Sequence, residues 1–257
     1  MKKVASYILM GSAVNAFAGE VMTTATPSAL RDLAADRPDA TESPITVDKG
    51  HWQIETSVVD YAKDFQFQAW TWGETNLKYG LTDNMDLQFV FAPYTEENNA
   101  GEITDGFGDV AFRLKYNVWG NDGGKSALAL FPYVKVPTGT ELSNDKWEGG
   151  FILPFAYELD DKWGFGCQLE WEYAYDDEND DYDSSLLHTA VLGYSLTDKW
   201  GVYGEYLGIF GHQYQAHASG GVTYAVTDLL QLDWGAVVGL NDAAQDFNTF
   251  TGFTVKF

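Results

Sequence analysis

Apolar and polar residues alternate along much of the chain, most clearly in the stretch Phe247–Phe257. There Phe253, Val255 and Phe257 alternate with glycine, threonine and lysine. Successive side chains of a β-strand point to opposite faces, so a period of two predicts a strand with one apolar and one polar face. The same pattern recurs in segment after segment, and the sequence therefore predicts an all-β protein.

Short polar turns separate these strands at a regular spacing. Four turns share an aromatic residue, a small or polar residue, an aliphatic residue and then turn formers, at 79–83, 157–161, 194–198 and 224–228. A fifth copy, at 116–118, runs into a glycine-rich stretch. The spacing fits two strands of about ten residues, a tight turn and a longer loop. Five turns join ten strands, and a first strand from Gly50 and a last strand ending at Phe257 give twelve.

The beginning of the chain has the three parts of a secretory signal peptide. Lys2 and Lys3 precede an apolar stretch, Val4–Val14, and Ala16–Ala18 supplies a small-x-small cleavage pattern. We expect a signal peptide at 1–18, an N-terminal periplasmic or plug segment at 19–49 and a barrel at 50–257. The apolar runs are too short for a spanning helix, so a membrane protein with this sequence would have to be a β-barrel.

Export combined with alternating strands favours a transmembrane barrel, in which apolar residues face lipid and polar residues face the lumen. The recurring tyrosines, together with Trp163 and Trp200, would form an aromatic girdle beside the short turns. A large soluble β-sandwich with tyrosine-rich turns is the alternative. The sequence thus predicts an antiparallel up-and-down transmembrane β-barrel of about twelve strands, integral to the bacterial outer membrane.

Individual strands differ in how cleanly their faces separate. Residues 109–118 and 163–175 divide into an apolar lipid-facing set and a polar lumen-facing set. Residues 151–158 and 186–196 carry apolar side chains on both faces, which is typical of a bulge or of a reversed orientation. Cys167, the single cysteine, excludes an internal disulfide and is expected to face lipid as a small apolar residue.

Both ends of the exported chain resemble one family. ADRPDATESPITVDKGHWQIE, residues 35–55, and LQLDWGAVVGLNDAAQDFNTFTGFTVKF, residues 230–257, are similar to the leader and last hairpin of an outer-membrane barrel family. That family is named for the MetA pathway of phenol degradation, and its members are labelled transporters. The resemblance implies a barrel with a transport role and carries over no catalytic residue.

The last strand also resembles the signal that outer-membrane barrels present to their assembly machinery. The resemblance rests on Gly252, Phe253, Val255 and Phe257, and it departs from the pattern at Val255, where an aromatic residue is more usual. We therefore expect that machinery, outer-membrane lipid and lipopolysaccharide as partners, together with a small solute of unspecified identity. The net charge of −23 argues against nucleic acid, and nothing in the sequence calls for a cofactor or specifies an oligomeric state.

Two acidic stretches, Tyr94–Asp105 and Asp176–Asp183, would form long connections at the end of the barrel opposite the short turns. Carboxylate oxygens are the ligands that calcium prefers, but the glycine and distal glutamate of an EF-hand loop are missing. We interpret the stretches as solvated loops, with weak divalent-ion binding as the alternative, and we predict no metal site.

A histidine and a serine two positions apart, His217 and Ser219, raise the alternative of an outer-membrane lipid hydrolase. Counting back from Tyr224 places both side chains toward the lumen, away from a lipid substrate. No third residue that would orient the imidazole is identifiable. The pair is therefore expected to be polar lumen residues, and the protein is not expected to be an enzyme.

Inward-facing charges divide the predicted lumen into two walls. Burying many unpaired carboxylates in a dry interior is very costly, so either the lumen is wet or something basic lies against its acidic wall. Walls of opposite charge are typical of pores for polar solutes, and salt-bridge ladders in a closed barrel are the alternative. The wall that we call basic carries Lys78, Arg113, Lys115 and Lys135, and it shares them with the acids Glu55, Glu74, Asp86 and Asp109, to which many of the bases are expected to pair. The acidic wall comprises Glu148, Glu170, Glu172, Glu205 and Asp233.

The segment before the barrel carries Arg31, Arg37 and Lys49, the charges that the acidic wall lacks. We expect it to dock in the barrel mouth as a plug, the alternative being a flexible periplasmic linker. Twelve strands should leave a narrow or pluggable pore. The sequence therefore predicts a passive channel for small solutes, with a structural or surface-display barrel without an open pore as the alternative.

Overall fold

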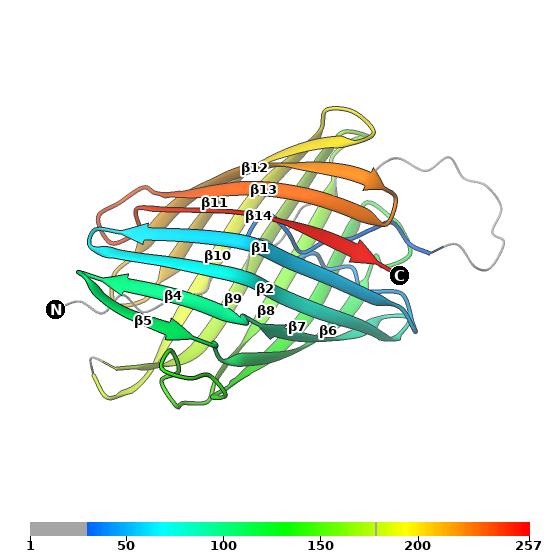
Figure 1. Cartoon of the computed structure of the whole chain (residues 1–257). Helices are drawn as coiled ribbons and strands as arrows, with labels where there is room; N and C mark the ends of the chain where they lie inside the picture. The colour runs from blue at the N-terminus through cyan, green and yellow to red at the C-terminus, as the bar shows by residue number, and fades with distance from the viewer. Residues whose placement is uncertain (1–29, 178) are drawn as a thin grey trace.

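The computed structural model describes residues 30–177 and 179–257, and the strands among them form one antiparallel sheet that closes on itself (Figure 1). The expected cleavage site and the start of the lead-in segment lie outside the described residues. Within the described part of the chain, no helix is long and apolar enough to cross a membrane. The strands are β1 (Trp52–Asp64), β2 (Phe67–Thr82), β3 (Met85–Phe91), β4 (Tyr94–Asn99), β5 (Glu102–Gly106), β6 (Val110–Trp119), β7 (Ser126–Val136), β8 (Glu148–Glu158), β9 (Trp163–Asp176), β10 (Asp181–Ser195), β11 (Trp200–Phe210), β12 (Gln215–Thr227), β13 (Leu230–Gly239) and β14 (Phe247–Lys256).

Twelve of these strands close the barrel. Strand β1 pairs with β14 on one side and with β2 on the other, so the sheet has no free edge there. At the seam, the backbone groups of Trp52 and Phe257 exchange two hydrogen bonds of 2.9 Å each. The up-and-down order and the expected number of barrel strands are confirmed.

The remaining two strands, β4 and β5, form a hairpin that extends the wall beyond β3 and β6. Pro93, which has no backbone N–H, follows β3, and β4 then resumes pairing with the far half of β2. The expectation of a long loop over Tyr94–Asp105 is therefore wrong, because this stretch is paired strand. The second acidic stretch also contains little loop, since β9 and β10 pair up to Asp176 and Asp181.

Cross-strand aromatic pairs mark the end of the barrel at which the short turns lie. In each pair a tryptophan lies directly opposite a tyrosine on the next strand, with ring centroids 4.6 to 4.7 Å apart. Such a ring of amphipathic side chains is the girdle expected at a membrane interface. The pairs are Trp52–Tyr79, Trp163–Tyr194 and Trp200–Tyr224.

The distribution of exposed and buried residues is the reverse of that in a soluble protein. On β6, Phe112 and Tyr116 are 43% and 40% exposed, whereas Arg113 and Lys115 on the opposite face are 4% and 1% exposed. Large apolar residues remain exposed on the outer face of most strands, while many charged residues are buried in the interior. This pattern is stable when the outer face contacts lipid, as in outer-membrane barrels.

Strands β8 and β10 are regular, contrary to the expectation of a bulge or a reversed face. The pairing of β8 with β9 and of β10 with both neighbours runs without a register shift. Their inward apolar side chains are genuine interior residues, since Ile152 and Val191 are both buried. The interior is thus only partly polar, and Leu207, Val237 and Phe250 form a small apolar cluster within it.

Candidate functional site

Residues 30–49, which we call the interior segment, lie inside the barrel without forming a strand of the sheet (Figure 1). Pro38 and Pro44 remove two backbone donors, which disfavours regular pairing. Lumen side chains satisfy the backbone N–H groups instead. The pairs are Asp36 with Glu55, Ala40 with Glu205, Glu42 with Gln168, Thr46 with Asn121 and Val47 with Asp86.

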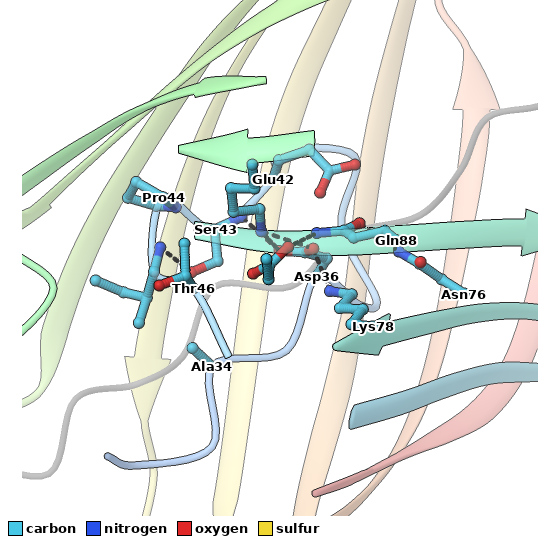
Figure 2. A network of polar contacts seen from close by, with 12 residues as sticks. Ala34, Asp36, Glu42, Ser43, Pro44, Thr46, Asn76, Lys78 and Gln88 are labelled. Atoms are coloured by element: carbon cyan, nitrogen blue, oxygen red, sulfur yellow. Dashed lines mark hydrogen bonds and ion pairs between the residues drawn. The ribbon is translucent and has the colours of Figure 1, made fainter. Parts of the chain in front are cut away.

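Asp36 is the centre of the contacts with the basic wall. Its carboxylate accepts hydrogen bonds from the ammonium groups of Lys78 and Lys115, the latter at 2.8 and 2.9 Å. It also accepts one from the backbone N–H of Ser43 at 2.9 Å, which folds the interior segment back on itself. Figure 2 shows Asp36 between Ser43 and Lys78, with Gln88 alongside. Lys78 additionally donates to Glu55 on β1.

A second contact with the same wall lies at Glu42. Its carboxylate accepts a hydrogen bond from Arg113, whose guanidinium carbon lies 4.4 Å from the centre of the Phe131 ring. The ammonium group of Lys115 lies 4.9 Å from the same ring. Both cations thus lie near the ring of one buried aromatic side chain, Phe131. The quadrupole of that ring attracts positive charge and helps to stabilise the two cations there.

Contacts with the acidic wall come from Arg37 and from the chain just after it. The Arg37 guanidinium donates to both carboxylate oxygens of Asp233, at 2.7 and 3.2 Å, and lies 5.5 Å from the centre of the Phe250 ring. Glu205 accepts a hydrogen bond from Ala40 N–H at 2.9 Å and one from the Thr41 hydroxyl at 2.7 Å. The interior segment therefore bridges the two walls.

The other expected lumen residues form a separate group toward the hairpin end. Lys135 pairs with Asp109 at 3.2 Å and with Glu148 at 2.6 Å. Glu170 accepts a hydrogen bond from Tyr133, and Glu172 accepts one from Ser185. All four, Lys135, Glu148, Glu170 and Glu172, are half-buried, and these contacts join barrel strands to one another.

Arg31 lies at the short-turn end rather than against the acidic wall. It pairs with Asp122 at 2.9 Å and donates to the Asp83 carbonyl at 2.6 Å. Lys49 is exposed.

The sequence analysis did not identify Asp36 and Glu42, whose carboxylates bind the cations of the basic wall. Their acidic side chains could have indicated this role, because both lie in the segment that is expected to dock.

Burial and neighbouring charges set the ionisation of the interior segment. Burial raises the pKa of Asp36, but Lys115 and Lys78 outweigh it, so the pKa lies well below its usual range. Burial raises the pKa of Glu42 to about 8, and the Arg113 guanidinium only partly opposes this. Burial lowers the pKa of Arg37, whereas Asp233 raises it by more. Asp36 and Arg37 are therefore firmly charged when docked.

Docking of the interior segment should weaken as the pH rises through the pKa of Glu42. In the docked state this carboxyl holds its proton up to about pH 8, whereas an unperturbed glutamate releases it near 4.5. Its contribution is full below the lower value and lost toward the higher one. We expect the current through reconstituted barrels to rise between about pH 4.5 and about pH 8 and to level off above that. Glu42→Gln should flatten this rise, and an unchanged rise in that variant would contradict the assignment.

Gly252 on β14 leaves the space that the Arg37 side chain occupies. A Cβ atom at this position would lie 2.6 Å from a terminal nitrogen of Arg37 and would clash with the Thr56 carbonyl oxygen on β1. We therefore expect Gly252→Ala to lower the thermal stability of the folded barrel. Gly204→Ala on β11, where nothing lies within 4 Å of the added atom, is the matched control and should melt like the wild type.

The histidine–serine pair does not have the geometry of a nucleophilic site. Neither ring nitrogen of the buried His217 has a hydrogen-bond partner among the described residues. The Ser219 hydroxyl lies 3.2 Å from the hydroxyl of Tyr203 instead. Over residues 30–177 and 179–257, no group of three or more histidine, cysteine or acidic side chains is arranged to hold a metal ion.

Comparisons with known proteins agree with this architecture. The COG4313 outer membrane channel from Pseudomonas putida F1 is similar in structure, with a TM-score of 0.64 and 16% identity over 84% of this chain and 98% of that chain. The KdgM porin has a TM-score of 0.50 and 9% identity over 77% of this chain and 98% of its own. A search of curated proteins finds no match. The sequence profile described as "Putative MetA-pathway of phenol degradation" matches residues 35–257, and the chain therefore belongs to that family.

Proposed function

We propose that this protein is a passive outer-membrane channel for small polar solutes and that the interior segment is its gate. The observation that carries the proposal is the way in which this segment is held. Side chains of the barrel wall bind its backbone and its charges, whereas the twelve strands pair without it. The segment can therefore leave its docked position while the barrel stays closed on itself.

The charges of the lumen support a polar solute. Arg113 and Lys115 on one wall and Glu205 and Asp233 on the other are all less than one-tenth exposed with the segment docked. Once the segment leaves, these side chains would line the path and attract ions and polar molecules. The fold it shares with an outer membrane channel supports passive transport in general and specifies no solute.

The proposed channel would be exported and would span the outer membrane. The apolar outer face would contact outer-membrane lipid and lipopolysaccharide, and a signal peptide would be cleaved after residue 18. The proposal does not include a lipid hydrolase, because such an enzyme would need His217 and Ser219 at the lipid-facing surface.

Conductance in planar bilayers tests the proposal. The wild type should show small or infrequent steps, and deletion of residues 20–45 should give larger and more frequent ones. If neither protein conducts, the structural barrel without a through-path is the better account. If the deletion changes neither conductance nor thermal stability, the interior segment is not a gate.

A further inference from the structure

The most deeply buried cations of the lumen meet on one carboxylate. Lys78 on β2 and Lys115 on β6 are each 1% exposed, and both donate to Asp36 of the interior segment. Uncompensated buried charge is strongly unfavourable, so two ammonium groups at this depth require an anion between them. In the docked state the chain itself supplies that anion.

The two lysines belong to the barrel, whereas the carboxylate belongs to a removable segment. Strands β2 and β6 both pair with β3, so the positions of Lys78 and Lys115 are fixed by the sheet. Asp36 reaches them from a segment that contributes no strand to the barrel sheet and is joined to it by an isolated bridge at Lys49. When the segment leaves, the two lysines stay in place and lose the carboxylate that they share.

The contacts of Lys115 favour another anion at the same place, because Asp36 is its one ion-pair partner within 4 Å among the described residues. Without the interior segment, Lys78 and Lys115 face the barrel carboxylates Glu55 and Asp86. Arg113 faces two other barrel carboxylates, Glu74 and Glu170. Glu55 already accepts from Lys78 and from Gln53, and Asp86 accepts from Gln88. The place of Asp36 is thus a site of the size of one carboxylate group that faces two ammonium groups.

We propose that Lys78 and Lys115 form a binding site for small carboxylate solutes, with Asp36 as a built-in competitor that occupies it in the closed channel. The proposal rests on the proposed function, because it names the solute class of the same lumen. A carboxylate that enters would take the place of the Asp36 side chain and free the interior segment. The channel would then open to the class of solute that it binds.

Binding to the full-length Asp36→Ala variant tests the site without reference to conductance. Acetate, which matches the removed side chain, should bind saturably in calorimetry and raise the melting temperature. Adding Lys115→Met should weaken this binding at least about tenfold, since one charged hydrogen-bond partner is lost. Adding Lys135→Met instead, at a lumen lysine that pairs with Asp109 and Glu148, should leave it unchanged. Circular dichroism would confirm that each variant retains its sheet.

Two control ligands and a conductance measurement distinguish a carboxylate site from a general effect of anions and from a barrel that does not conduct. Acetamide, which is neutral, and chloride at the same ionic strength should not reproduce the effect of acetate. Equal effects of chloride would overturn the carboxylate class, and no saturable acetate binding would overturn the site. In bilayers, acetate should increase the open time of the wild type. Binding without any conductance in any variant would leave the site standing and refute the channel.

Discussion

Asp36→Ala is expected to give the largest increase in conductance of any single substitution in the interior segment. The change removes the carboxylate that pairs with Lys78 and Lys115 and accepts the Ser43 N–H. Removing one partner of a buried ion pair costs about 3–5 kcal/mol, because the other partner is left uncompensated. A loss of this size would shift the balance between docked and released segment by about a hundred- to several-thousand-fold.

Single-channel recording measures this shift as the fraction of time spent in the open level. Asp36→Asn is the informative companion, because it keeps the shape and one acceptor but removes the charge. It should open the channel less than alanine does and more than the wild type. Circular dichroism would first show that the Asp36→Ala barrel keeps its native secondary structure. If that barrel then spends the same fraction of time open as the wild type, the contact between Asp36 and the two lysines does not hold the interior segment in place.

Arg37→Glu is the second change with a large expected effect. It replaces the guanidinium that binds both oxygens of Asp233 with a carboxylate facing that buried carboxylate. The loss of the pair costs about 3–5 kcal/mol, and repulsion at the same place adds to it. We expect leakage of small solutes into liposomes to rise and the thermal stability of the barrel to fall.

Two further variants separate the ion pair from a general effect of charge. Lys49→Glu makes the same charge change at an exposed position of the interior segment and should leave leakage close to the wild-type value. Arg37→Glu combined with Asp233→Arg restores an opposite-charge pair and should recover part of the closure. If the double variant leaks as much as the single one, the pair is not what closes the lumen.

Much of the barrel follows from patterns that are local in sequence. Alternation on β6 separates Phe112 from Arg113, and the repeated tyrosine turns give the number of strands, because both depend on spacing along one hairpin. The β4–β5 hairpin was not predictable in this way. Its acidic side chains have the composition of a loop, yet the long β2 strand offers them a pairing edge.

The contacts of the interior segment depend on pairs far apart in sequence. Charge complementarity suggested that an arginine would meet the acidic wall, and Arg37 does meet Asp233, 196 positions away. Composition could not show that Asp36 would reach Lys115, or that Arg31 would stay at the short-turn end. Both outcomes depend on where the chain turns at Ser43 and enters β1, and no sequence pattern encodes that path.

A reversible cross-link between the interior segment and the wall tests the gate most directly. The hydroxyl oxygens of Thr41 and Thr189 on β10 lie 2.6 Å apart, so cysteines at these positions are close enough for a disulfide. With Cys167 replaced by alanine, the Thr41→Cys/Thr189→Cys protein would be recorded in bilayers before and after reduction. Our account predicts no open steps while the disulfide is intact and wild-type steps after reduction. Equal conductance in the oxidised and reduced states would contradict it.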